Sequence, residues 1–356
     1  MRIPTFLRNS LPQVIAMTNL LIHIGIHKTG TSALQELLYQ NQDKLLSKGV
    51  NVISHIDFKA KNDFQYATDF EKSVSDELKA YIATHAKGNA YNVFSAEYLS
   101  GNPFELFDNL PVCMRMLDQA TKGFDCQVLV TFRRQDDFLQ SLYAQFSQTA
   151  HTRKHQLEGL TLDGLKERLF RKETSYQYLN WVNFHRVLTD TFGNDRVQVA
   201  SFQAEPSQDA LHKIAQLTSK ESVFESLMLP SNNLSMSSEA SQINLELGEK
   251  LSTRVEKKYL RSLLQLHGSK KLGAPHKFIT YEEASDILEN YRLDNQSMTS
   301  RIGYPIFRGL EKSEGSDKTS KEEILKRLVL QLIKEKHTKG GQGIKGYLKG
   351  ITSRFK

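Results

Sequence analysis

The chain has 356 residues, 39% of them apolar and 24% charged. This composition supports a sizeable core and excludes disorder, collagen and coiled coil as descriptions of the whole chain. No apolar run approaches the ~18 residues of a membrane span. The two cysteines, Cys113 and Cys126, form no C-x-x-C motif and no disulfide framework. So low a cysteine count is typical of a reducing compartment, and we expect a cytoplasmic protein.

The net charge of +7 is concentrated near the C-terminal end. Residues 311–356 contain 12 Lys and Arg against 6 Asp and Glu, a net charge of +6, which leaves +1 for the rest of the chain. The body is therefore not a basic nucleic-acid-binding domain. The pattern of residues 321–337 predicts a basic amphipathic helix. This helix is either docked on the rest of the chain or in peripheral contact with the anionic inner face of the membrane. Residues 1–16 lack the apolar stretch of a signal peptide, and we interpret them as an N-terminal extension outside the fold.

Strand and helix patterns alternate through the first two-thirds of the chain. Apolar runs predict strands, and periodic segments between them predict helices at 32–47, 65–87, 106–121, 135–149 and 176–191. The strands are expected at 19–26, 50–54, 91–96, 127–132 and 196–202. This alternation indicates an α/β fold with a central parallel sheet covered on both faces. After about residue 230 the pattern becomes helical, so we expect one domain over 17–310, with an α/β body and a helical C-terminal portion, followed by the 311–356 tail.

The strongest local signal lies between the first strand and the first helix, where residues 25–32 read Gly-Ile-His-Lys-Thr-Gly-Thr-Ser. Gly25 and Gly30 allow the backbone to approach a phosphate closely, and a helix N-terminus offers unpaired N–H groups. Lys28 adds a full positive charge, and hydroxyl donors come from Thr29, Thr31 and Ser32. The pattern therefore predicts an anion site.

The same segment argues against a nucleoside triphosphate site. In the P-loop motif the lysine follows the second glycine, whereas Lys28 precedes Gly30. A triphosphate site also needs a carboxylate for Mg²⁺, but the 127–132 strand is followed by Arg133 and Arg134. Two arginines suit a second anion better than a metal, and we expect no metal site.

Residues 25–32 resemble the 5′-phosphosulfate loop of sulfotransferases that use 3′-phosphoadenosine 5′-phosphosulfate (PAPS), particularly the bacterial carbohydrate-type members. The family's second motif, an arginine after a later strand and a serine eight residues on, is matched by Arg133 and Ser141. Arg134 is the neighbour that could substitute for Arg133. The resemblance covers about residues 18–302 and implies a P-loop-like three-layer fold. It also implies PAPS as cofactor, adenosine 3′,5′-bisphosphate (PAP) as product, and Arg133 and Ser141 at the 3′-phosphate.

The resemblance also suggests roles in catalysis. Lys28 would stabilise the negative charge that grows on the bridging oxygen as the sulfuryl group leaves. A general base should deprotonate the acceptor, and by its order along the chain Glu97 is the candidate, with His27 as the alternative. Ser95, near the end of the same strand, is a further candidate contact to the phosphosulfate.

The function predicted from the sequence is sulfuryl transfer from PAPS to an acceptor hydroxyl. By resemblance, the acceptor is a carbohydrate or glycolipid. Two alternatives remain at this stage: a P-loop nucleotide kinase or NTPase, and a non-catalytic protein that binds nucleotide or glycan.

Overall fold

The structure, a computed structural model, describes residues 18–149, 164, 167, 179–202, 209–227, 240–241, 243–244, 247, 259–264, 278–305, 307, 310 and 324–325. The chain divides into two compact units. The first contains Met1–Leu142, Asp163–Asn232 and Ile279–Glu311, and the second contains Tyr143–Leu162, Asn233–Phe278 and Lys312–Lys356. The candidate site lies in the first unit. The domain limits at 16 and 310 stay predictions.

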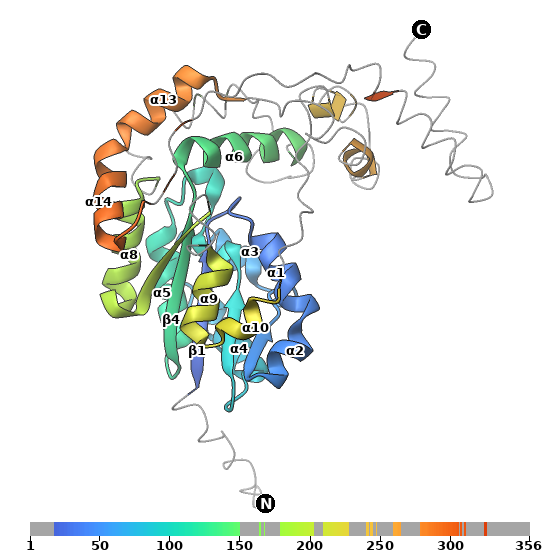
Figure 1. The fold of residues 1–356 in the computed structure, drawn as a ribbon, viewed down its shortest axis with the longest axis vertical. Coiled ribbons are helices and arrows are strands. Elements are labelled where there is room, and N and C mark those ends of the chain that lie inside the picture. Colours follow the sequence, from blue (N-terminus) through green and yellow to red (C-terminus); the bar gives the residue numbers. More distant parts are fainter. Residues whose placement is uncertain are drawn as a thin grey trace, which may run out of the picture. The chain divides into compact units, whose positions relative to one another are not determined.

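Five strands of the first unit form an all-parallel sheet in the order β2-β3-β1-β4-β5 (Figure 1). They are β1 Asn19–Gly25, β2 Val50–Ile53, β3 Tyr91–Ser95, β4 Asp125–Phe132 and β5 Val197–Ser201. Each predicted strand is confirmed to within two residues at either end. Because every neighbouring pair is parallel, the carboxyl ends of all five strands meet at one edge of the sheet, where open α/β sheets bind ligands.

Helices cover both faces of this sheet, giving the predicted P-loop-like three-layer α/β fold (Figure 1). On one face, Leu21, Val93 and Leu129 of the sheet share an apolar core with α1 Thr31–Gln40, α2 Gln42–Ser47, α9 Ala210–Thr218 and α10 Glu221–Phe224. On the other face lie α4 Lys72–His85, α5 Leu110–Thr121 and α8 Trp181–Phe192. Among the described residues, the other helices are α3 Lys61–Gln65, α6 Gln135–Thr149, α13 Tyr281–Asn290, α14 Arg292–Ile302 and the 3₁₀ turns η2 Glu97–Ser100, η3 Pro103–Glu105 and η6 Asn194–Arg196.

The single helix predicted over 65–87 is wrong: the structure has α3 and α4, with a turn between them. The reason is a contact with a distant residue. Asn109 Nδ2 donates to Gln65 O at 2.8 Å and to Ala67 O at 2.9 Å. These carbonyls are therefore satisfied by a side chain rather than by continuing helix, and the chain turns before α4 begins.

Three other predicted helices begin or divide differently. The helix predicted over 176–191 is α8, which begins at Trp181 because the Asn180 side chain caps its first turn. In the predicted 106–121 helix, Leu106 and Phe107 have positive φ angles of 50° and 62°, which a helix cannot contain, so α5 starts at Leu110. Proline near the N-terminus of α5 favours that start because its missing N–H costs nothing in the first turn. The predicted 32–47 helix is interrupted at Asn41, which separates α1 from α2. The predicted 135–149 helix coincides with α6.

The second unit contains a small apolar cluster formed by Ala240, Ile243, Leu263, Leu264 and Ile324. Ile324 belongs to the apolar face predicted for the tail helix, and it is fully buried in this cluster. At that position the docked alternative is therefore favoured over membrane contact. Apart from residues 324 and 325, the tail lies outside the described residues, as do residues 1–17.

Within the described part of the chain, no helix has both the length and the apolar character needed to cross a membrane. Cys113 and Cys126 are free thiols in the interior, and burial raises the pKa of each to about 12. Both thiols are therefore protonated at neutral pH.

Candidate functional site: an anion-binding loop beside a carboxylate

The loop between β1 and α1 is tightly constrained by its own side chains. A Cβ atom on Gly25 would lie 1.9 Å from Thr31 Cγ2, so only glycine fits where the strand ends. Gly30 has a φ of 74°, and a side chain there would also meet the ring of Phe202 at 2.7 Å. Lys28 adopts a φ of 71°, although it lacks the freedom of glycine. The loop therefore keeps a strained conformation that other contacts must support.

Helix α1 begins directly at the end of this loop. Gly30 is its N-cap, and no side chain caps the helix. The N–H groups of the first turn can therefore bind an anion. Two of the three predicted hydroxyl donors are engaged within the protein: Thr29 Oγ1 donates to Ile26 O at 2.7 Å, and Thr31 Oγ1 donates to Glu97 Oε2 at 2.7 Å. Ser32 is exposed.

Arg133, at the end of β4, supports the loop directly. Its Nη1 donates to Lys28 O at 2.6 Å, although the two residues are 105 positions apart in the sequence. The guanidinium carbon lies 5.0 Å from the centre of the Phe202 ring. Burial lowers the pKa of Arg133 but leaves it charged, and its buried Nε has no hydrogen-bond partner among the described residues. Arg133 thus brings a partly unsatisfied cation to the loop.

Arg134 is held elsewhere. Its Nε and Nη2 donate to the two oxygens of Asp136 at 2.7 and 2.9 Å, and Nη2 also lies 3.4 Å from Asp137 Oδ2. The adjacent arginines therefore have different roles. Ser141, predicted as the partner of Arg133, lies partly exposed on α6 and makes no hydrogen bond to the loop in the described part of the chain.

Glu97 begins η2, directly after β3, and lies against the loop. Besides the Thr31 hydroxyl, it faces His27, with Glu97 Oε1 3.8 Å from His27 Nδ1. Burial acts to raise the pKa of Glu97. His27, the Thr31 hydrogen bond, Lys28 and, more weakly, His55 outweigh this effect, and the pKa lies below its ordinary value. Glu97 is therefore a carboxylate at neutral pH.

His27 is buried beneath this carboxylate, and its ring orientation is set by Gln65. The Gln65 amide nitrogen lies 3.1 Å from His27 Nε2 and donates to it, so the ring proton lies on Nδ1. Nδ1 is the nitrogen that faces Glu97. His27 therefore presents a donor to the carboxylate.

A further buried histidine, His23, was not predicted as part of the site. Its Nδ1 lies 2.8 Å from Ser95 Oγ and its Nε2 lies 2.8 Å from Thr131 Oγ1, so it links the ends of β3 and β4 across β1. Burial lowers its pKa to about 4, and the ring is neutral at pH 7. The sequence offered one sign that His23 has a special role, which is that a histidine interrupts the apolar run 19–26. Ser95 is 5% exposed and is engaged in this link.

The described residues contain no group of three or more His, Cys, Asp or Glu side chains arranged to hold a metal ion. Glu97 is the carboxylate in contact with the loop, through Thr31. In the part of the chain that the structure describes, Lys28, Arg133 and Glu97 are charged groups at the loop.

No family model matches the chain. No curated protein matches it either. Among solved structures, the chain is similar to a sulfotransferase from Alicyclobacillus acidocaldarius, with 12% sequence identity and a TM-score of 0.43, over 81% of this chain and 96% of that chain. So distant a similarity carries no argument about chemistry, which must come from the site itself.

The Thr31–Glu97 hydrogen bond predicts how the pKa of Glu97 responds to a substitution of Thr31. Replacing Thr31 with valine removes the donor that stabilises the carboxylate, so the pKa of Glu97 should rise. Carboxyl ¹³C NMR titration, with the resonance assigned by Glu97→Gln, measures this directly. Thr84→Val, an exposed substitution on α4, is the matched control and should leave the midpoint unchanged. An unchanged Glu97 midpoint in Thr31→Val would contradict the assigned contact.

Proposed function

We propose that the protein is a sulfotransferase that moves a sulfuryl group from PAPS to an acceptor hydroxyl, with a carbohydrate or glycolipid as the acceptor class. The observation that carries this proposal is the hydrogen bond from Arg133 Nη1 to Lys28 O. It joins the two predicted anion-binding motifs into one cationic region, beside which Glu97 lies as a carboxylate.

The residues present fit a nucleotide that carries phosphate in two places. Lys28 and the uncapped first turn of α1 suit the 5′-phosphosulfate, and the unpartnered Nε of Arg133 suits the 3′-phosphate. Phe202 contributes a ring that is 42% exposed and packs against both Gly30 and Arg133. Such a ring next to a phosphate site can pack against a base.

PAPS, when bound, supplies a sulfuryl group joined to phosphate through a bridging oxygen. Transfer would join the acceptor oxygen to sulfur and break the bond from sulfur to the bridging oxygen, and Glu97 would accept the proton of the acceptor hydroxyl. Lys28 and the loop N–H groups stabilise the negative charge left on the released phosphate oxygen. Arg133 contributes orientation and affinity, since it contacts the loop rather than the reacting bond.

The contacts of Glu97 support it as the base in preference to His27. His27 Nε2 is occupied by Gln65, and Nδ1 carries a proton directed at Glu97. His27 therefore acts as a positioning residue that holds the carboxylate. The low pKa of Glu97 makes it a weak base in the free protein. A phosphosulfate bound at the loop adds negative charge nearby and would raise that pKa, making Glu97 a stronger base.

One observation favours a second candidate, an NTPase or kinase. In P-loop NTPases, Mg²⁺ is held by a loop Ser or Thr and a carboxylate from a neighbouring strand end. The pair formed by Thr31, at the start of α1, and Glu97, just after β3, resembles that donor set. Against it, Thr31 stands where the P-loop motif has its lysine.

Thermal melting with different nucleotides separates these functions. At equal concentrations, PAP should raise the melting temperature by several degrees, whereas ADP and ATP with Mg²⁺ should not. A ligand at ~100 times its Kd adds about 2.7 kcal/mol to the free energy of unfolding. Stabilisation by ATP with Mg²⁺ alone would establish the NTPase alternative and refute the proposal. If PAP, ADP and ATP with Mg²⁺ all leave the melting temperature unchanged, the alternative of a non-catalytic binding protein would be favoured.

Glu97→Gln tests the catalytic step. The amide keeps the size of the side chain but is not a proton acceptor, so sulfuryl transfer from labelled PAPS should fall by ~10²–10⁴-fold. PAP affinity should be retained, which a titration calorimetry experiment checks in the same preparation. Glu282→Gln, on the exposed surface of α13, is the matched control. Transfer within a few-fold of the wild-type rate in Glu97→Gln would exclude Glu97 as the base.

A further inference from the structure

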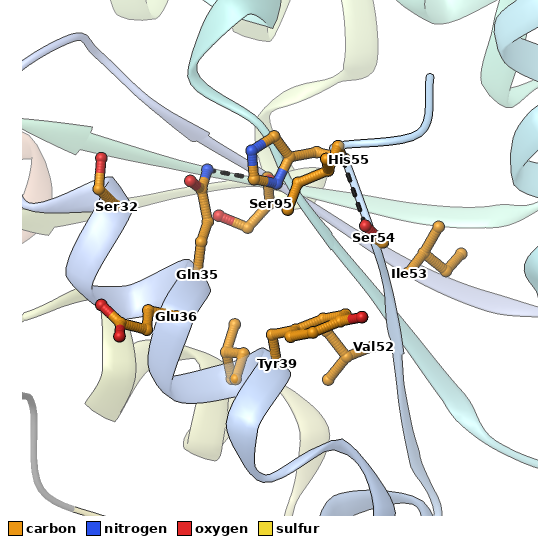
Figure 2. A pocket seen from close by; sticks show the side chains of 11 residues that line it. Ser32, Gln35, Glu36, Tyr39, Val52, Ile53, Ser54, His55 and Ser95 are labelled. Carbon is orange, nitrogen blue, oxygen red and sulfur yellow. Dashed lines mark hydrogen bonds between the residues drawn. The ribbon is translucent and has the colours of Figure 1, made fainter. Parts of the chain in front are cut away.

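A pocket of about 340 Å³ lies between α1 and the end of β2, next to the anion-binding loop (Figure 2). Its wall on the α1 side comes from residues spaced so that they share one helix face. The opposite wall comes from the chain as it leaves β2, and Ser95 contributes from the end of β3. The lining residues are Ser32, Gln35, Glu36, Leu38, Tyr39, Val52, Ile53, Ser54, His55, Ile56 and Ser95.

Each wall contains a hydrogen bond between a side chain and the main chain. Gln35 Nε2 donates to Ser95 O at 3.1 Å, which fixes α1 against the end of β3 (Figure 2). The Ile56 N–H donates to Ser54 Oγ at 3.3 Å, which turns the chain away after β2. The pocket is therefore part of the sheet's carboxyl edge, where α/β folds bind ligands.

Polarity changes along the pocket. Helix α1 runs away from the loop, so Ser32 lies at the loop end and Tyr39 lies seven residues, about 10 Å, further on. At the loop end, Gln35 lies near Ser95 and His55; at the far end, Tyr39 lies near Val52 (Figure 2). Tyr39 is 50% exposed, and Ile56, which also lines the pocket, is 60% exposed. The pocket thus offers hydrogen-bonding groups at one end and apolar surface at the other.

The lining also lacks positive charge. None of the eleven residues is Lys or Arg, and Glu36 is a carboxylate. Burial lowers the pKa of His55, which keeps its ring neutral at pH 7. Outside the lining, Lys61 and Asp57 act on His55 with opposite signs. An acidic acceptor would find no counter-ion in this pocket and would be repelled by Glu36.

The polar end of the pocket adjoins the proposed base. Ser32 follows Thr31, the residue that donates to Glu97, and Ser95 precedes Glu97 by two positions. Glu97 acts electrostatically on His55, which lines the pocket. A hydroxyl group held at the polar end would therefore lie close to Glu97.

We propose that this pocket binds an uncharged amphipathic acceptor, with its hydroxyl-bearing head toward Glu97 and its apolar portion between Tyr39 and Val52. This inference rests on the proposed function, and it narrows the acceptor from hydroxyl compounds in general to neutral ones that carry an apolar group. An acidic glycan would not be a substrate.

The test compares three glycosides by saturation-transfer NMR and titration calorimetry: methyl β-D-glucopyranoside, hexyl β-D-glucopyranoside and hexyl β-D-glucuronide, each below its micellar concentration. The hexyl glucoside should bind at least tenfold more tightly than the methyl glucoside, because its methylene groups leave water at the apolar end. It should also bind at least tenfold more tightly than the hexyl glucuronide. Equal affinities for the three, or tighter binding of the glucuronide, would overturn the proposal.

Substitutions in the pocket test whether hexyl glucoside binds there. Tyr39→Ala removes a half-exposed ring from the apolar end of the pocket. The variant should bind hexyl glucoside at least fivefold more weakly than wild type, while its affinity for methyl glucoside changes little. Tyr281→Ala, which removes a 40% exposed tyrosine from α13, is the matched control and should have no effect. Unchanged hexyl glucoside affinity in Tyr39→Ala would place the ligand elsewhere and refute the pocket.

PAP melting measured on the same samples separates this proposal from the proposed function. Stabilisation by PAP without the predicted glycoside preference would refute the pocket and leave the sulfotransferase proposal intact. The predicted preference without stabilisation by PAP would support the pocket as a glycoside site but would refute its role in sulfuryl transfer.

Discussion

The candidate site depends on one constraint, the left-handed conformation of Lys28. A non-glycine residue with a φ of 71° is strained by ~1–2 kcal/mol. It persists because Arg133 Nη1 holds the Lys28 carbonyl from the neighbouring strand end and because Thr29 closes the loop onto Ile26. The same arginine thus shapes the loop and brings a positive charge to the candidate anion site.

Neutral and charged hydrogen bonds then connect this loop to both of its neighbouring strands. His23 joins β3 to β4 across β1 as a neutral ring, and Thr31 joins the start of α1 to Glu97 after β3. Because these links lie at the carboxyl edge of the sheet, the cationic side toward β4 and the carboxylate side toward β3 are fixed relative to the loop between them. That separation suits a reaction in which one side binds an anion and the other receives a proton.

Sequence reasoning located the strands and the loop because apolar runs and glycine spacing are local properties. The resemblance to the family's second motif predicted Arg133, with Arg134 as the neighbour that could substitute for it. The difference between the two arginines comes from Asp136, which binds Arg134 through both oxygens. The break between α3 and α4 also escaped prediction, since Asn109, the residue that causes it, lies more than 40 positions away. Contacts of this kind are set by tertiary structure and leave no periodic signal.

The most direct test of the account is the affinity for PAP of Arg133→Ala compared with Arg134→Ala, by titration calorimetry, with buried Trp181 as a fluorescence monitor of folding. A charge-assisted hydrogen bond contributes ~1.5–3 kcal/mol, so Arg133→Ala should weaken PAP binding by about tenfold or more. The charge of Arg134 is already paired with Asp136, so the Arg134→Ala variant should bind PAP with an affinity within about threefold of wild type. Folded Arg133→Ala protein with wild-type affinity, or a larger loss in Arg134→Ala, would contradict the account.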